Sequence, residues 1–224
     1  FQSYNIISIK IIYFNDIIQV MTKVNKTSNW VRQHAEDPFV KKSKQDKYRS
    51  RAAYKLKAID EKYNFLKKIT SVADLGCAPG SWLQVLKEFK NINFIVGIDL
   101  LNVEPVDGVC IAKQDIGDYD LYMELFEKKD SKLDLVLSDI APNITGISDV
   151  DQSNFSDIAL NILGFCRFKL KPKGTLIMKY FLGSSFEVTL KTLNNNFNKI
   201  NVFKPPSSKK KSNEVYLICI EFKD

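Results

Sequence analysis

The stretch Val72-Ala-Asp-Leu-Gly-Cys-Ala-Pro-Gly-Ser-Trp82 predicts the fold of the chain. Its apolar first half includes an acidic residue and is typical of a buried strand, and its small second half predicts a tight turn into a helix. Gly76 and Gly80 permit sharp turns and close approach of a ligand, and Pro79 suits a loop or a first helical turn. This order is typical of nucleotide-like cofactor sites in α/β proteins, although a purely structural turn has the same pattern.

Strand and helix patterns alternate from residue 71 to the end of the chain, which predicts a doubly wound α/β sheet. After the Val72 stretch we expect strands at Asn93–Asp99, Val109–Ala112, Leu133–Asp139, Thr175–Lys179, Lys199–Phe203 and Glu214–Phe222, the last two forming a closing pair. The expected helices are Trp30–His34, Ala52–Ile59, Trp82–Phe89, Leu121–Lys128, Asn154–Leu170 and Ser185–Leu193.

The composition is that of one globular domain with a basic surface. The chain has 224 residues and a net charge of +7, and an excess of cations attracts polyanions such as nucleic acid. The four cysteines are dispersed and His34 is the only histidine, which excludes a zinc cluster, a disulfide framework and a histidine-based nucleophilic triad. We therefore expect a chain without a metal in a reducing compartment.

The first residues have a different character from the rest. Residues 1–26 are interpreted as an N-terminal extension, either a targeting leader or an accessory helix, and residues 27–224 as a single domain. Because the sequence starts with Phe1, we expect translation to begin upstream or at Met21. The segment Tyr4–Val20 is too short and too polar to span a bilayer, so no membrane association is expected. A leader would direct the protein to a mitochondrion or another organelle, with the cytoplasm as the alternative.

Acidic residues end or follow the first four predicted strands, at Asp74, Asp99, Asp115 and Asp139. Each alone suits a helix cap or a turn, but the carboxyl ends of parallel strands meet at one edge of a sheet, where ligands bind. A nicotinamide cofactor is one candidate, because Asp99 follows Asp74 at close to the interval of roughly 20 residues used for ribose binding. The loop lacks the G-x-G-x-x-G spacing, however, and the acids would repel a pyrophosphate. They suit the amino group and sulfonium cation of S-adenosylmethionine.

Two basic segments predict an anion-binding surface. The segment Lys41–Arg51 has six cations and one acid, and the connector Lys204–Asn213 is basic and contains two prolines. Arg51 and Lys55 are four residues apart and share one side of the helix that follows the first segment. A solvated charged face is the plainer interpretation of such runs, and binding of structured RNA is the functional one.

Taken together, these motifs resemble the FtsJ/RrmJ-type ribosomal RNA 2′-O-methyltransferases. The resemblance extends from about Ser28 to the C-terminus. It rests on a basic helix, a cofactor loop, a fourth-strand motif, a strand-end lysine and a C-terminal segment, which are Arg49–Leu56, Asp74–Trp82, Ser138–Asn143, Lys179 and Lys204–Tyr216. Two departures are the lysines at Lys209–Lys211, where arginine is usual in the family, and Ser81, where a third glycine is common.

The resemblance implies a mostly parallel, seven-stranded sheet of the Rossmann-like, S-adenosylmethionine-dependent methyltransferase type, with its closing strands antiparallel at one edge. It implies methyl transfer to a ribose 2′-hydroxyl of ribosomal RNA, a uridine of the large subunit, with S-adenosylhomocysteine as the other product. The implied catalytic tetrad is Lys55, Asp139, Lys179 and Glu214. We expect Lys179 to accept or direct the hydroxyl proton, Asp139 and Glu214 to orient the ammonium groups, and Lys55 to stabilise the developing oxyanion.

The implied binding residues form two further sets. The cofactor set is Asp74, Gly76, Ala78, Pro79, Gly80, Trp82, Asp99, Asp115, Ile116 and Asp139. The RNA-binding set is Lys47, Arg49, Arg51, Lys204, Lys209, Lys210 and Lys211. The expected partner is ribosomal RNA or a precursor of the large ribosomal subunit, and we expect a monomer. The alternatives are a tRNA or messenger-cap 2′-O-methyltransferase, or an inactive RNA-binding assembly factor with the same fold.

Overall fold

A computed structural model describes residues 36–118, 132–142, 145–209 and 211–223. By its internal contacts the chain divides into two compact units, Phe1–Lys41 and Lys42–Asp224, and helix α3 (Pro38–Gln45) crosses the boundary between them. The predicted extension 1–26 and the predicted helices Trp30–His34 and Leu121–Lys128 lie outside the described residues. The second unit contains the predicted cofactor loop.

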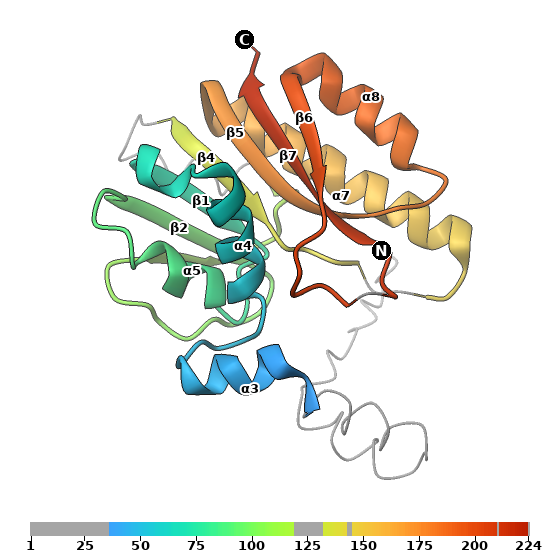
Figure 1. Ribbon diagram of the computed structural model, residues 1–224. Helices are drawn as coiled ribbons and strands as arrows, with labels where there is room; N and C mark the ends of the chain where they lie inside the picture. The colour runs from blue at the N-terminus through green and yellow to red at the C-terminus, as the bar shows by residue number, and fades with distance from the viewer. Residues whose placement is uncertain (1–35, 119–131, 143–144, 210, 224) are drawn as a thin grey trace, which may run out of the picture. The chain divides into compact units, whose positions relative to one another are not determined.

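A mixed seven-stranded sheet forms the centre of this second unit, in the order β3-β2-β1-β4-β5-β7-β6 (Figure 1). The five strands from β3 to β5 are parallel, and β7 is antiparallel to both β5 and β6. The strands are β1 (Ser71–Leu75), β2 (Phe94–Asp99), β3 (Cys110–Lys113), β4 (Leu133–Ser138), β5 (Leu170–Phe181), β6 (Phe197–Phe203) and β7 (Glu214–Phe222). This arrangement confirms the predicted fold class.

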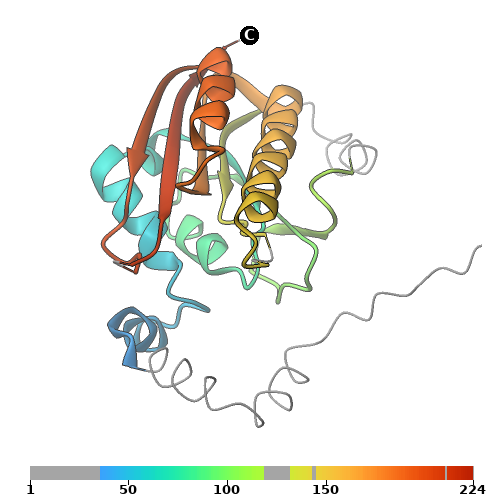
Figure 2. The same cartoon turned by 90° about the vertical axis from the view of Figure 1, so that its right-hand side faces the viewer.

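Helices cover both faces of the sheet. Those on one face are α4 (Ala53–Tyr63) and α5 (Ser81–Leu86), and those on the other are α7 (Ser148–Lys169) and α8 (Phe186–Asn196), which lie side by side in Figure 2. Because strand side chains alternate between faces, β7 contributes to two separate cores. Tyr216 and Ile218 pack in the cluster with α4 and α5, and Leu217 and Cys219 in the cluster with α7 and α8.

Element boundaries depart from the sequence prediction in two places that matter. Strand β5 runs to Phe181 rather than ending at Lys179, because its last residues pair with the start of β7. It also begins earlier, at Leu170. Helix α7 begins at Ser148 rather than Asn154, with Asp149 and Asp151 in its first turn, where acidic side chains favour a helix.

The parallel topology brings the four strand-end acids to one edge of the sheet, as predicted. Asp74 is in β1, Asp99 ends β2, Asp139 directly follows β4 and Asp115 lies two residues beyond β3. Within the described ranges, no helix is long and apolar enough to cross a membrane. The same part of the chain contains no group of His, Cys, Asp and Glu residues suited to a metal ion.

Candidate functional site

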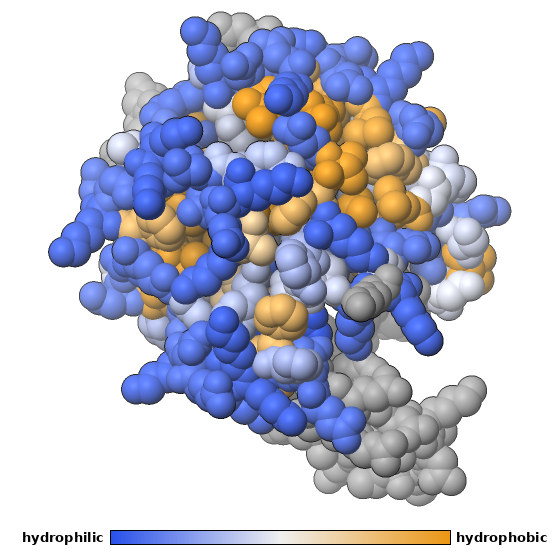
Figure 3. All heavy atoms as spheres, in the orientation of Figure 1, coloured by the Kyte–Doolittle hydropathy of each residue, from blue (hydrophilic) through white to orange (hydrophobic). Residues whose placement is uncertain are grey.

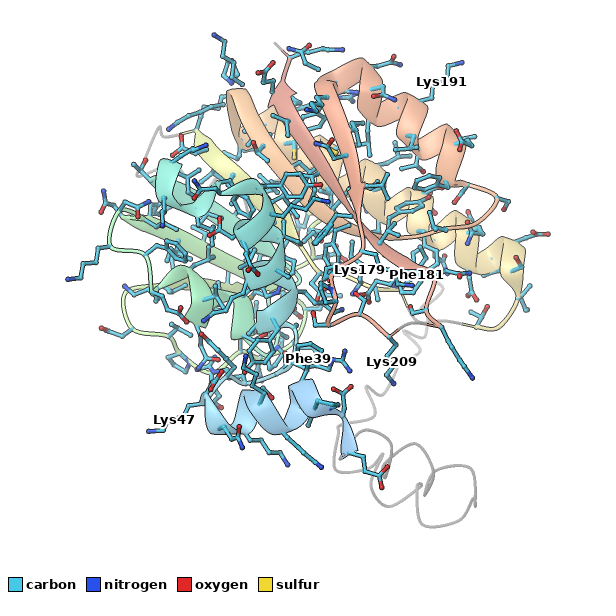
Figure 4. All side chains as sticks on the ribbon, viewed as in Figure 1. Phe39, Lys47, Lys179, Phe181, Lys191 and Lys209 are labelled. Carbon is cyan, nitrogen blue, oxygen red and sulfur yellow. The ribbon has the colours of Figure 1, made fainter. Side chains whose placement is uncertain are left out.

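Four charged side chains that are distant in sequence converge beside the carboxyl ends of β4 and β5. Lys55 comes from α4, Asp139 follows β4, Lys179 lies in β5, and Glu214 begins β7. The Lys179 Nζ lies 3.0 Å from Asp139 Oδ1 and also donates to the main-chain carbonyl of Asp139. The Lys55 Nζ lies 2.9 Å from Glu214 Oε1 and 3.9 Å from Asp139 Oδ1. The structure therefore brings all four predicted catalytic residues together, and Figure 4 labels Lys179.

Two hydroxyl groups that the sequence analysis did not identify complete this network. The Tyr216 hydroxyl donates to Asp139 Oδ1 at 2.6 Å, and Ser208 Oγ donates to Glu214 Oε1 at 2.7 Å. Tyr216 reaches the site because it pairs with Lys179 across the antiparallel β5–β7 ladder. Its position two residues after Glu214 on a strand places both side chains on one face, which is the signal that could have identified it.

The charges in this network support one another. Burial raises the pKa of Asp139, but the ammonium groups of Lys179 and Lys55 and the Tyr216 hydroxyl outweigh that effect, so the net pKa is lowered. Burial, followed by the nearby Asp139 charge, raises the pKa of Tyr216 well above its usual value. Asp139 is therefore a carboxylate and Tyr216 a hydrogen-bond donor at neutral pH.

A cavity of about 610 Å³ opens beside the tetrad at the same edge of the sheet. Six of the predicted cofactor residues line it, namely Gly76, Ala78, Asp99, Asp115, Ile116 and Asp139. The other lining residues are not among the predicted cofactor contacts; they are Leu100, Leu101, Gln114, Ile140, Ala141, Pro142, Ile158 and Asn161. Most of these are apolar and come from loops and from α7, so the cavity combines acidic groups with an apolar wall.

The remaining predicted cofactor residues do not line this cavity. Trp82 is buried and donates its indole N–H to the Ala52 carbonyl at 2.7 Å, so it fixes the start of α4 instead. Pro79 and Gly80 lie against Arg49, whose guanidinium donates to the Pro79 carbonyl at 3.1 Å. Gly80 has a φ of +101°, which favours glycine, and a Cβ there would lie 2.5 Å from Arg49 Nη1, so the guanidinium would have to shift.

Asp74, the first of the strand-end acids, is buried in β1. Both carboxylate oxygens are buried and accept no hydrogen bond within the described structure. Burial, together with the charges of Asp139 and Asp99, raises the pKa of Asp74 well above its usual value. By contrast, Asp99 accepts the main-chain N–H groups of Ala78 and Leu101, each at 2.8 Å, and so shapes the loops around the cavity.

Gly76 allows the cofactor loop to pack against the loop after β4. Its φ is +74°, and a Cβ there would lie 2.2 Å from Ile140 Cγ1. Ser81, the departure from the family pattern, is buried and shares a 2.8 Å hydrogen bond with Ser50 Oγ.

The predicted RNA-binding residues divide into exposed and engaged groups. Lys47, Lys204, Lys209 and Lys211 are exposed, and Figure 4 shows Lys47 and Lys209 pointing outward. Lys204 is also engaged, because its Nζ donates to the Ser212 carbonyl at 2.5 Å. Arg49 also donates to the carbonyls of Glu104 and Pro105, at 2.6 and 2.8 Å, and Arg51 donates to that of Ser207. Lys210 and Asn143, the latter part of the fourth-strand motif, lie outside the described residues. RNA binding by this set stays a prediction.

Known proteins share both the sequence and the fold. The family model described as FtsJ-like methyltransferase matches residues 48–222. The chain is 39% identical over 194 residues to a ribosomal RNA large subunit methyltransferase E from Methylobacillus flagellatus, covering 86% of this chain and 94% of the relative. It is 43% identical over 198 residues to the protein of that name from Bartonella bacilliformis, covering 87% and 83%. A crystal structure of a ribosomal RNA methyltransferase from Plasmodium falciparum superposes with a TM-score of 0.69 at 35% identity, covering 78% of this chain and 98% of the other.

Proposed function

The chain belongs to the FtsJ-like methyltransferase family, and from this membership we propose that it methylates a ribose 2′-hydroxyl of large-subunit ribosomal RNA. The observation that carries the proposal is the convergence of Lys55, Asp139, Lys179 and Glu214 beside a cavity for the methyl donor. We further propose a uridine as the target nucleotide.

The chemistry requires a positioned proton acceptor, because a ribose hydroxyl is a poor nucleophile at neutral pH. The carboxylate and the main-chain carbonyl of Asp139 both accept hydrogen bonds from Lys179 Nζ. When the amine is neutral, these bonds use its two N–H groups and leave the nitrogen lone pair for the substrate hydroxyl. In its neutral form Lys179 accepts the hydroxyl proton as the new oxygen–methyl bond forms. Lys55, held by Glu214, provides a cation for the charge that develops on the oxygen.

The residues around the cavity fit S-adenosylmethionine as the methyl donor. Its volume of about 610 Å³ suits a ligand of that size. Asp99 and Asp115, which line the cavity, favour a cationic ligand, and the apolar wall suits an aromatic base. When bound, this cofactor supplies a methyl group already activated on a sulfonium cation. Asp99, Asp115 and Ile116 would hold it, with Gly76 and Ala78 providing close backbone approach.

The decisive experiment offers a labelled methyl donor together with unmodified large-subunit RNA, assembled subunits or tRNA. We expect the labelled methyl group to be incorporated into the ribosomal RNA. The methylated nucleotide should resist alkaline cleavage, because its 2′-hydroxyl is blocked. Lys179→Ala should lower turnover by about 10²- to 10⁴-fold with donor binding intact, and Lys191→Ala on exposed α8 serves as the control (Figure 4).

Two other results would reject the proposal in different ways. Transfer to tRNA alone would identify a different substrate for the same tetrad. RNA binding without transfer to any of the three substrates would instead identify an assembly factor. Near-wild-type turnover of Lys179→Ala would remove Lys179 from the mechanism.

A further inference from the structure

A second cavity, of about 440 Å³, lies at the opposite end of the parallel strands from the tetrad. Asp134, near the start of β4, lines it, whereas Asp139 of the tetrad follows the end of the same strand. Their separation of five positions in the sequence corresponds to roughly 17 Å of extended chain. The two sites are therefore separate but within reach of one structured RNA.

A bulge in β5 builds one wall of this second cavity. Leu133 pairs with Leu170 and Leu135 pairs with Thr175, so Asp134 alone lies opposite four residues of β5. Within the bulge, Lys173 has a φ of +65°. Bulges redirect side chains out of the regular ladder, and here Lys171 and Lys173 both border the cavity.

The cavity is lined by more positive than negative charge. The Asp134 Oδ1 lies 2.6 Å from Lys171 Nζ, and Oδ2 accepts the main-chain N–H groups of Thr70 and Ser71. Burial raises the pKa of Asp134, but these partners lower it to about 2, so Asp134 and Lys171 neutralise each other. Lys68 and Lys173 also line the cavity, and in the described part of the chain neither pairs with an acid.

The rest of the lining is apolar and partly aromatic. Tyr63 ends α4 and is half-buried, and Phe65, two residues later, is buried. Ile218, which is buried, and the half-buried Ile220 come from the face of β7 that packs in the cluster with α4. The Tyr63 ring also makes an edge-to-face contact with the Phe203 ring, at a centroid distance of 5.9 Å. Figure 3 shows apolar residues over β6 and β7 on this face, bordered by hydrophilic ones. A planar apolar group joined to an anion matches this combination of surfaces.

We propose that this cavity binds an unpaired nucleotide of the RNA substrate, with the base against Tyr63 and Phe65 and the phosphate beside Lys68 and Lys173. Stacking on aromatic side chains and phosphate pairing with cations are two of the contacts that single-stranded RNA makes with proteins. This inference rests on the proposed function for its choice of RNA rather than a free nucleotide. The second cavity would then hold a part of the RNA distant from the methylated ribose.

The test uses the full chain and a ten-nucleotide oligouridylate containing 4-thiouridine, with uridine monophosphate as a second probe. We expect photocrosslinks on the peptide that contains Tyr63 and Phe65. The double variant Lys68→Ala/Lys173→Ala should weaken oligonucleotide binding by about tenfold and reduce the salt slope of log K by about 1.4, since each phosphate contact contributes roughly 0.7. Lys173→Arg should retain binding, and Lys191→Ala, on exposed α8, should leave both quantities unchanged.

The outcomes separate this inference from the proposed function, because methyl transfer by the wild-type protein is measured independently on ribosomal RNA. Transfer by the wild type, with crosslinks elsewhere and an unchanged salt slope in the double variant, would overturn only the second site. Crosslinks at Tyr63 or Phe65 without transfer to any RNA would reject the proposed function and retain the nucleotide site. Equal affinity for uridine monophosphate and for the oligonucleotide would overturn the assignment to RNA. Each variant should unfold thermally at the same temperature as the wild type, which shows that the substitution leaves the fold intact.

Discussion

The Tyr216 hydroxyl is the smallest group whose removal tests how the tetrad is held. Tyr216→Phe deletes one oxygen, which donates to Asp139 Oδ1 at 2.6 Å, and the ring stays fully buried. A hydrogen bond to a charged acceptor contributes about 1.5–3 kcal/mol. We expect that loss in the free energy of unfolding at pH 7. If the same interaction positions Lys179 in the transition state, turnover falls by ~10- to 100-fold at most.

The pH dependence shows whether the lost interaction involves the Asp139 charge. The pKa of Asp139 is lowered in the folded protein from its ordinary 3.8, so ionisation contributes stability above that value and the contribution is lost as pH falls through the folded pKa. Because Tyr216 is one cause of that lowering, Tyr216→Phe raises the folded pKa. The stability difference between variant and wild type should therefore shrink as pH falls from 7 toward 3.

Tyr180→Phe is the matched control for this measurement. Tyr180 is equally buried and neighbours Lys179 in β5, but among the described residues its hydroxyl bonds only the neutral Ser185 and Thr189 hydroxyls, at 2.7 and 2.8 Å. We expect a loss of about 0.5–1.5 kcal/mol, independent of pH, and normal methyl transfer. Urea unfolding at several pH values, combined with the labelled-donor assay, measures all of these quantities. A Tyr216→Phe loss as insensitive to pH as that of the control would refute the charge-based account.

Three further predictions concern the cofactor cavity and the connector. The pKa of Asp74 is raised in the folded protein, so its ionisation costs stability as pH rises above the unfolded value. Asp74→Asn should therefore become more stable relative to wild type in urea unfolding between pH 4 and 8. Gly76→Ala combines a φ of +74° with a clash against Ile140, whereas Gly146→Ala combines a φ of +84° with no atom within 4 Å of the new Cβ. Gly76→Ala should therefore lower thermal stability by more than Gly146→Ala. Equal losses would contradict the close approach of Gly76 to Ile140. Replacing all three lysines Lys209–Lys211 by alanine should reduce the salt slope of RNA binding by about 2, and an unchanged slope would exclude the connector from the RNA surface.

Much of the fold could be predicted because local patterns and topology agree. The strand Glu214–Phe222 has the boundaries that its sequence predicts, and the four acids do reach one edge. The convergence of the acids at one edge could be predicted from the parallel strands alone, because the carboxyl ends of parallel strands all lie at the same edge of the sheet. The β5 bulge could not be predicted, because Lys173-Gly174 indicates a turn but not which residue of β4 lies opposite.

The site shows a similar division. The resemblance to the family leads to the four tetrad residues, since each matches a position in one of the family's motifs. The motif also assigns Trp82 to the cofactor, but the structure turns its indole toward Ala52, because side-chain direction on a short helix depends on packing that the motif does not contain. Tyr216 and Ser208 could not be predicted because their roles depend on a cross-strand pairing and on the course of the connector.

The balance of charges within the tetrad indicates which residues of this enzyme contribute to RNA affinity and which to methyl transfer. Lys55 and Lys179 face Asp139 and Glu214, so the formal charges of the four side chains cancel when both lysines are protonated. A neutral cluster gains little from a phosphate backbone, whose binding to proteins depends on uncompensated cations. RNA affinity must therefore come from cations outside the tetrad, such as those of the connector. Tetrad variants should lose turnover while keeping RNA affinity, and surface lysine variants should do the reverse.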